Sequence, residues 1–429
     1  MKFIAKVFLV FLFLSLYHKP EFVFIPFSNN TFFGVLGFLS YILDRKTANL
    51  ILQTKSINYT KILKFSYPVA IIALASIVIN NTHDIYYLKL PLVLLLAFFA
   101  NYFLARIAYY AYGKFDIKLF LDYFILAHFL YLGVSVMMFF NSSFMEFIQG
   151  LLKIDDVGLD AYERTAGTRI IGFGASYFAS GLLNGFFLIL LSVYICTFRL
   201  SDKKRVLLLL FYVITLVIGM AMARTTMIGA VIGICLLLYL SLSNIILLFK
   251  VVFYGLITLF SAILLFSFVI DYYNLDIAYL AKFAFEIVEN YFTTGKASSS
   301  SMDKMWEMYN ILPQDNSTWL IGDALFVDPS GFGYYKNVDI GYLRAIWYFG
   351  LLGTFFLFRY YYKSIKYLIL DLNLFGKGSK VIFFTLFSYV LIINLKGPCD
   401  LFYYLVALFF CNRDYKKNNT LRFNKTSLS

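Results

Sequence analysis

Charged residues are scarce in this chain. Only 14% of its 429 residues are Asp, Glu, Lys or Arg, whereas soluble domains carry about 25%. Hydrophobic residues reach 61%, and they fall in blocks near the roughly 20 residues that a helix needs to cross a bilayer. This composition excludes an ordinary soluble protein and predicts an all-α, polytopic integral membrane protein.

Residue patterns for metals, disulfides and nucleotides are missing as well. The histidines are His18, His83 and His128, and neither HExxH nor DxD occurs. The four cysteines lie in or beside apolar blocks without CxxC spacing. No GxGxxG or Walker pattern is present. We therefore predict no metal site, no structural disulfide and no nucleotide or other cofactor.

The apolar blocks predict twelve transmembrane helices. The second, third, eleventh and twelfth are the shortest or the most interrupted by polar residues and proline. The spans are 3–17, 26–43, 66–80, 86–110, 117–140, 170–198, 206–223, 226–243, 247–270, 341–358, 381–395 and 399–411. The first follows Lys2 and Lys6 and has no small-residue cleavage site, which is typical of an uncleaved signal anchor.

Basic residues predict the orientation. With these spans, 25 of the 37 Lys and Arg fall on the side of the N-terminus and 12 on the other side. Cytoplasmic loops collect Lys and Arg, so both termini are predicted to be cytoplasmic. The net charge of +13 is thus distributed asymmetrically, which indicates contact with anionic membrane lipids and not with nucleic acid.

The chain is predicted to form a single transmembrane domain, 1–429, with external loops at 141–169 and 271–340. In the longer loop, apolar residues recur at helical spacing from Ile277 to Tyr291 and predict an amphipathic helix. A second helix is expected after the serine run 298–301, where Ser300 and Asp303 have capping-box spacing. We interpret the serine run as a flexible link. Two helices in one loop predict a lid over a cavity.

Several charges near the predicted membrane boundaries need an explanation, because charge inside a bilayer is costly unless it is paired or hydrated. Arg106, Asp122 and Lys250 lie near cytoplasmic ends, where we interpret the basic pair as snorkelling side chains. His128 is interpreted as a packed or hydrogen-bonded core residue. These four residues are assigned structural roles.

The external arginines are the candidates for function. Arg224 lies in a tight turn in MARTTMIGA, Arg164 and Arg169 lie at the outer mouth of the sixth span, and Arg344 lies one turn inside the tenth. Each has an ordinary alternative: a hairpin arginine in water, pairing with loop acids, or snorkelling. Planar guanidinium groups bind phosphates through paired hydrogen bonds. A functional role that all four arginines could share is therefore binding of a lipid-linked diphosphate.

The stretch WLIGDALFVDPSGFGYYKNVDIGYLRAIWYFGLLG resembles the last large periplasmic loop of bacterial O-antigen polymerases of the Wzy type. ARTTMIGAV is similar to the turn that this family shares with O-antigen ligases, although Ala223 replaces the usual serine. The likeness covers about fifty residues. The family's RX10G pattern is absent, because neither Arg164 nor Arg169 has a glycine eleven positions later.

This resemblance implies transfer of a growing glycan from one undecaprenyl diphosphate to the non-reducing sugar of another lipid-linked repeat unit. The implied partners are these donor and acceptor lipids, membrane lipids and a chain-length regulator. Arg224, Arg344 and one of Arg164 or Arg169 would stabilise the diphosphate charge.

A carboxylate is the natural base for the acceptor hydroxyl. Asp339 is the first candidate, followed by Asp323 and Glu163. Asp339 has a second reading, orientation of Arg344 from the helix start, and from the sequence we favour that reading narrowly.

Aromatic residues before the tenth span are candidate sugar platforms. Tyr334, Tyr335 and Tyr342 are assigned to substrate binding together with Lys336, although Tyr and Trp are also ordinary at membrane interfaces. Trp347 is interpreted as such an interface residue.

Three rival functions differ in what they require. A flippase for lipid-linked oligosaccharide would not need a folded external loop, and the chain shows no repeat between its halves, which transporters often have. A ligase normally offers a histidine in the long loop, and 271–340 contains none. A non-catalytic subunit would leave the external arginines without a role.

Overall fold

The computed structural model describes residues 1–52, 59–154, 162, 165, 168–242, 244–273, 278–296, 298–330 and 333–411, with the backbone alone at 262–273, 278–282, 285, 288 and 377. The prediction of an all-α protein is confirmed: 77% of the structure is helix and the described residues form no strand.

Six helices are long and apolar enough to cross a membrane, which supports the predicted membrane protein. They are α4 (Thr60–Asn80), α5 (Leu90–Tyr112), α6 (Ile117–Phe140), α9 (Tyr177–Thr197), α10 (Asp202–Met222) and α16 (Gly341–Lys366), which a π-helical turn, Tyr367–Asp371, extends.

The other helices of the bundle include shorter ones and α12 (Ile245–Tyr273), of which only the backbone is described from residue 262 onward. They are α1 (Lys2–Phe13), continued by a π-helical turn (Leu14–His18), α2 (Asn29–Leu43), α3 (Arg45–Leu52), α7 (Ser142–Leu151), α11 (Thr226–Leu242), α12, α17 (Ser379–Asn394) and α18 (Phe402–Leu405). The predicted span 399–411 is only α18 followed by a 3-10 helix, Val406–Phe410, buried in the core. The count of twelve spans stays a prediction.

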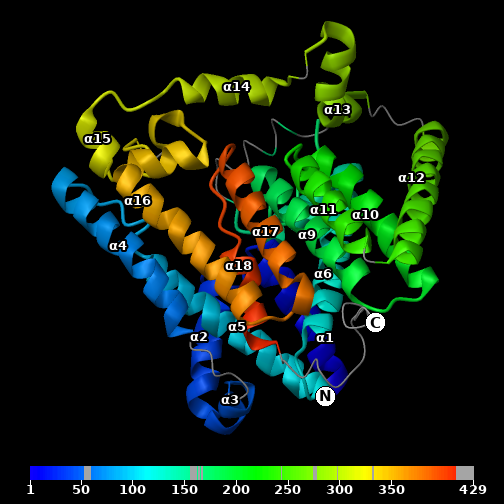
Figure 1. Ribbon diagram of the computed structural model, residues 1–429, viewed down its shortest axis with the longest axis horizontal. Coiled ribbons are helices and arrows are strands. Elements are labelled where there is room, and N and C mark those ends of the chain that lie inside the picture. Colours follow the sequence, from blue (N-terminus) through cyan, green and yellow to red (C-terminus); the bar gives the residue numbers. More distant parts are fainter. Residues whose placement is uncertain are drawn as a thin grey trace, which may run out of the picture.

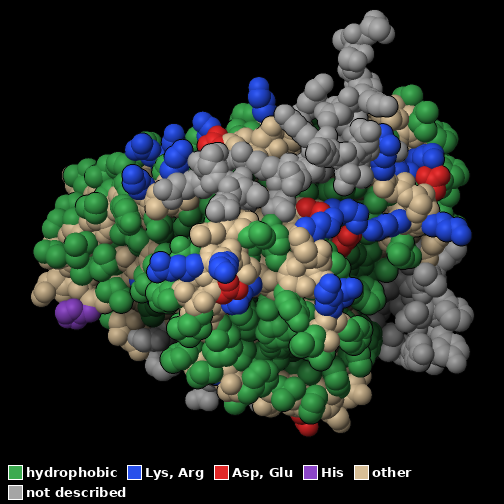
Figure 2. All heavy atoms as spheres, turned by 90° about the horizontal axis from the view of Figure 1, so that it is seen from below, with side chains coloured by type: hydrophobic (Ala, Val, Ile, Leu, Met, Phe, Trp, Pro, Cys, Tyr) green, Lys and Arg blue, Asp and Glu red, His purple; other side chains and the backbone are tan. Residues whose placement is uncertain are grey.

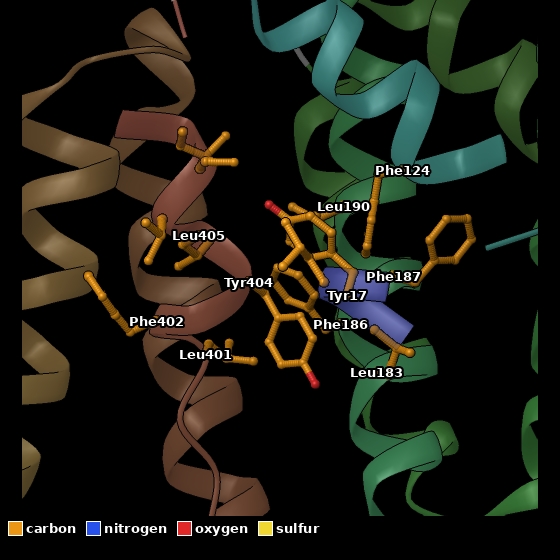
Figure 3. Packing of buried hydrophobic residues seen from close by; sticks show 14 of the residues in the cluster. Tyr17, Phe124, Leu183, Phe186, Phe187, Leu190, Leu401, Phe402, Tyr404 and Leu405 are labelled. Atoms are coloured by element: carbon orange, nitrogen blue, oxygen red, sulfur yellow. The ribbon is translucent and has the colours of Figure 1, made fainter. Parts of the chain in front are cut away.

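Helix α9 forms the centre of the bundle. In its membrane-length stretch, 89% of the residues are buried, against 33% in α4 at the edge, as expected for a helix that is apolar on every side. Glycines let α11 approach it: a Cβ on Gly229 would lie 2.1 Å from the Cα of Gly185. Aromatic rings from α6, α9 and the C-terminal segment fill the space beside it (Figure 3).

The bundle has two distinct ends in Figure 1. The lower end carries the N-terminus and α3, and Lys and Arg side chains gather on it when it is seen from below (Figure 2). The upper end carries α13 (Ala278–Thr294), α14 (Ser300–Tyr309) and α15 (Asn316–Ile321). The two amphipathic helices predicted for 271–340 are therefore present as α13 and α14, although Ile277 lies outside the described residues.

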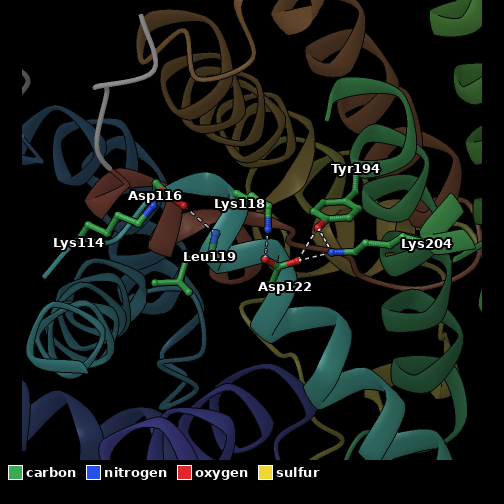
Figure 4. Close-up of polar contacts among 7 residues, drawn as sticks. All are labelled: Lys114, Asp116, Lys118, Leu119, Asp122, Tyr194 and Lys204. Carbon is green, nitrogen blue, oxygen red and sulfur yellow. Dashed lines mark hydrogen bonds and ion pairs between the residues drawn. The ribbon is translucent and has the colours of Figure 1, made fainter. Parts of the chain in front are cut away.

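Ion pairs hold the charges of the lower end. Asp122 on α6 accepts hydrogen bonds from Lys118 at 2.5 Å, from Tyr194 at 2.5 Å and from Lys204 at 3.4 Å, which joins α6, α9 and α10 (Figure 4). Two further pairs, Arg106 with Asp44 at 3.2 Å and Lys250 with Asp202 at 2.8 Å, replace the snorkelling that we expected.

His128 is a packed core residue, as predicted. Its Nδ1 lies 3.2 Å from Nε2 of His18, and its ring stacks on Phe187 with centroids 3.7 Å apart.

Candidate anion-binding site at the upper end

Arg224 lies in the three-residue turn between α10 and α11 and points under the lid formed by α13 and α14. Its Nε donates a hydrogen bond to the carbonyl of Phe283 at 2.7 Å, and its guanidinium lies 4.4 Å from the Phe283 ring. Its Nη2 forms an ion pair with Glu286 of α13. Burial lowers the pKa of Arg224, and Glu286 opposes this shift. The Arg224 side chain is only 10% exposed, and Glu286 of the lid holds it in place.

The serine run 298–301 spans the start of α14 and contributes to the same site, so our interpretation of it as a flexible link was wrong. Ser299, not Ser300, caps α14 by accepting a hydrogen bond from the Met302 N–H. Ser300 donates its N–H to Glu286 at 2.9 Å. Ser301 Oγ accepts hydrogen bonds from Arg224 and from Lys396, each at 3.4 Å.

Lys396 is a second cation of the site, and sequence reasoning missed it. It follows α17, and its Nζ reaches Ser301. Burial and the charge of Arg224 both lower its pKa, while Asp339 raises it. Its position on the predicted external side, where basic residues are disfavoured, is the signal that would have identified it. Glu286 gave no such signal, because it lies on an ordinary amphipathic helix.

Arg169 is the third cation. Its guanidinium stacks on Tyr177 at 4.1 Å and lies 5.8 Å from the Phe283 ring that Arg224 also contacts. Its buried Nε has no hydrogen-bond partner within the part of the chain that the structure describes. Burial lowers its pKa, and the nearby charge of Arg224 adds to this effect. Arg164 and Glu163 lie outside the described residues.

Arg344 occupies a separate position. Its guanidinium is sandwiched between the rings of Phe326 and Tyr334, at 3.6 and 3.7 Å, and its Nη2 donates to the Phe326 carbonyl at 3.2 Å. The side chain is nearly fully buried. The ion pairs of the described residues do not join it to Asp339.

Asp339 lies just before α16, within electrostatic reach of both Arg344 and Lys396. Its N–H donates to the sulfur of Met308 at 3.4 Å. Burial raises the pKa of its carboxyl group, and the charges of Arg344 and Lys396 partly offset this shift. The carboxylate therefore interacts electrostatically with both groups. A buried carboxylate with a raised pKa is a better base than an exposed one.

The remaining predicted residues hold the segment that leads into α16. Asp323 accepts hydrogen bonds from Thr318 at 2.7 Å and from Tyr335 at 3.0 Å. Lys336 lies 5.3 Å from the Tyr335 ring. Tyr342 donates to the Leu391 carbonyl at 3.0 Å. Of these, Tyr334 is the most exposed ring, at 45%.

Arg224, Arg169 and Lys396 thus converge at one end of the bundle. Of these three cations, only Arg224 has an ion-pair partner among the described residues. Three desolvated cations with hydroxyl groups beside them can bind an anion with several oxygens. The described residues contain no group of three or more His, Cys, Asp or Glu that could hold a metal ion. Comparisons of the chain with protein-family models, curated proteins and solved structures gave no match.

Proposed function

We propose that this protein polymerises lipid-linked oligosaccharide repeat units into an O-antigen or related surface polysaccharide, using undecaprenyl diphosphate donors at the periplasmic face of a bacterial inner membrane. The observation that carries the proposal is the convergence of Arg224, Lys396 and Arg169 beneath the α13–α14 lid. A lipid diphosphate presents several charged oxygens at the membrane surface, where this site would lie. The resemblance of 319–353 to polymerase loops supports the same ligand.

The reaction needs little beyond charge stabilisation and a base. The acceptor hydroxyl oxygen forms a bond to the anomeric carbon of the donor glycan, and the bond from that carbon to the diphosphate oxygen breaks. Undecaprenyl diphosphate leaves with the bonding electrons, and Arg224, Lys396 and Arg169 stabilise the charge that develops on it. No nucleotide is required, because the donor already carries its leaving group.

Asp339 is our proposed base for the acceptor proton. No ion pair joins its carboxylate to Arg344 among the described residues, so their interaction is only through the longer-range charge, and its burial favours proton acceptance. Asp323 is less suited because Thr318 and Tyr335 already engage both of its oxygens.

Glu286 would act before the chemistry. Its carboxylate pairs with Arg224, so a diphosphate that binds this guanidinium would have to displace it and loosen the lid.

The proposed topology has both termini in the cytoplasm and 271–340 in the periplasm. Gathering of Lys and Arg on the lower end supports this orientation (Figure 2). Cysteines at exposed positions test it: Lys296→Cys should react with an impermeant maleimide in spheroplasts, whereas Lys380→Cys should react only after lysis. Cys235→Ala provides the background, since the other three cysteines are buried. The opposite labelling pattern would reject the orientation.

Gene deletion tests the activity itself. We expect single repeat units on the lipid A core when the polysaccharide is separated on a gel. Complete polymer that accumulates on undecaprenyl diphosphate would instead identify a ligase. Repeat units trapped on the cytoplasmic leaflet would identify a flippase.

A further inference from the structure

A second concave site lies beside the arginines and plays no part in the proposed diphosphate contacts. It is a pocket of about 860 Å³, within the range of about 300–1,000 Å³ typical of small-molecule sites. Its polar lining comes from Lys19, Glu21, Lys153, Tyr162, Ser176 and Tyr177. Val23, Leu152 and Ile154 add an apolar wall.

The backbone around this pocket is strained at several points. Lys19 and Tyr177 have positive φ angles of 54° and 52°, which are uncommon for residues other than glycine. Gly174, with φ +98°, lines the same pocket. Strained residues cluster at ligand sites, where the surrounding structure maintains them.

Close packing maintains this strain. Residues 14–18 form a π-helical turn, an irregularity common at functional sites. Its last carbonyl, that of His18, accepts a hydrogen bond from the Ala175 N–H at 2.6 Å. A Cβ on Gly174 would lie 2.4 Å from the same oxygen. The 18–20 and 172–177 segments are therefore locked together, and Lys19 is presented to the pocket.

The ammonium of Lys19 lies beside two tyrosine rings and lines the pocket. It lies 5.6 Å and 5.7 Å from the ring centroids of Tyr403 and Tyr404, yet the side chain remains exposed. Glu21 is also exposed, and among the described residues it forms no ion pair. Lys19 interacts electrostatically with Glu21 and with Asp400, so the pocket offers a ligand both a hydrogen-bond donor and an acceptor of opposite charge.

Tyr177 joins this pocket to the anion-binding site. Tyr177 lines the pocket, and its ring centroid lies 4.1 Å from the guanidinium of Arg169. Arg169 in turn shares the Phe283 ring with Arg224. Two side chains, Arg169 and Phe283, thus connect Tyr177 in the pocket to Arg224 in the proposed diphosphate site.

We propose that this pocket binds the oligosaccharide of the acceptor, an inference that rests on the proposed function. Sugars offer many hydroxyl groups and apolar ring faces, and the lining supplies an ammonium, a carboxylate and hydroxyls together with tyrosine rings. A lipid chain would meet too many charges here. A growing donor glycan has no fixed length, whereas a pocket of about 860 Å³ suits an oligosaccharide of fixed size such as one repeat unit.

Binding measurements on the full-length protein in lipid nanodiscs test this proposal. The two probes are inorganic diphosphate and the oligosaccharide repeat unit, released by mild acid from the lipid-linked pool of the deletion strain. We expect Lys19→Gly and Glu21→Gln each to weaken oligosaccharide binding by about tenfold or more and to leave diphosphate binding unchanged. Arg224→Ala should show the reverse pattern.

Glycine at position 19 separates binding from folding. It adopts a positive φ without strain, so the thermal midpoint of Lys19→Gly should equal or exceed that of the wild type. Lys296→Gln, an exposed lysine at the same end of the bundle, is the matched control and should bind both probes normally.

The outcomes distinguish the pocket from the proposed function. Oligosaccharide binding that is absent in the wild type, or unchanged in both pocket variants, overturns the assignment of the pocket even if Arg224 still binds diphosphate. Diphosphate binding that survives Arg224→Ala, with oligosaccharide binding still dependent on Lys19, overturns the diphosphate site and leaves the sugar pocket standing.

Discussion

At the lower end of the bundle, carboxylates and cations satisfy one another: Asp122 accepts from Lys118 and Lys204, and Asp202 pairs with Arg205 and Lys250. At the upper end, the described residues form a single ion pair, between Arg224 and Glu286, while Arg169 and Lys396 lie nearby with lowered pKa values caused by burial. Both ends are rich in charge, so charge alone does not identify a site. A site is indicated by an excess of buried cations over acids. Removing a cation from water costs free energy unless an anionic partner, such as a ligand, compensates for the lost hydration.

The largest expected effect is at Arg224. Arg224→Ala should lower polymerisation by about 100- to 1000-fold, and Arg224→Lys should recover part of the loss, since lysine keeps the charge but not the planar fork. Turnover of lipid-linked repeat units per folded protein measures the effect. Arg106→Ala, which breaks an ion pair at the lower end, is the matched control. Equal losses in the two alanine variants would remove the distinction between the ends.

Asp339→Asn should lower turnover by about 100-fold or more with donor binding intact. Because burial raises the pKa of this carboxyl group in the folded state, ionisation costs stability as the pH rises through that pKa. The asparagine variant should therefore match or exceed the thermal midpoint of the wild type at pH 7, and the difference should vanish near pH 4. A variant that keeps substantial turnover would restore the orientation role.

Arg344 tests whether an upper-end arginine can be structural. Its guanidinium is buried between two rings, so Arg344→Ala should cost roughly 2–4 kcal/mol of stability and reduce turnover mainly through loss of folded protein. Unfolding in mixed micelles gives the stability, and Arg344→Lys should restore a part. If the alanine variant is stable but binds no diphosphate, Arg344 belongs with Arg224.

Glu286→Gln should have a smaller effect of opposite sign. It removes the carboxylate that competes for Arg224, so inorganic diphosphate should bind about tenfold more tightly, equivalent to about 1.4 kcal/mol. Glu289→Gln, an exposed residue on the same helix, should leave the affinity unchanged. Weaker diphosphate binding in the Glu286 variant would show that this carboxylate positions Arg224 for the ligand and does not compete with the ligand.

The smallest effect is expected at the lower end. Asp122→Asn keeps a hydrogen-bonding oxygen for Tyr194 and Lys204 but loses the charge, which should cost about 1 kcal/mol of stability. Turnover per folded protein should stay within about twofold of the wild type. A large loss of turnover at normal stability would mean that the lower end also takes part in function.

Local patterns predicted much of this fold. Apolar blocks identified the long helices, and the spacing of apolar residues identified α13 and α14, because both signals lie in consecutive residues. The short final segment was misjudged for the same reason: 399–411 is apolar enough for a span, but the structure folds it into two short helices within the core.

The site was predicted only in part. Arg224 and Arg169 were selected from their predicted external position, whereas Glu286 and Lys396 come from other segments and are joined to Arg224 through Ser301 and the lid. Arg344 was predicted to bind the same diphosphate as Arg224; that role stays a prediction, and the structure shows its guanidinium enclosed by Phe326 and Tyr334.

The sequence by itself determined that this chain is helical, membrane-embedded and more basic at one end, because hydropathy and charge act on each segment separately. Only the tertiary structure decided which cations are paired. That depends on where segments distant in the chain meet: Asp44 meets Arg106 at the lower end, whereas at the upper end Lys396 approaches Arg224 and Asp339. Contacts between distant segments are set by packing of the whole bundle, so no local pattern contains them.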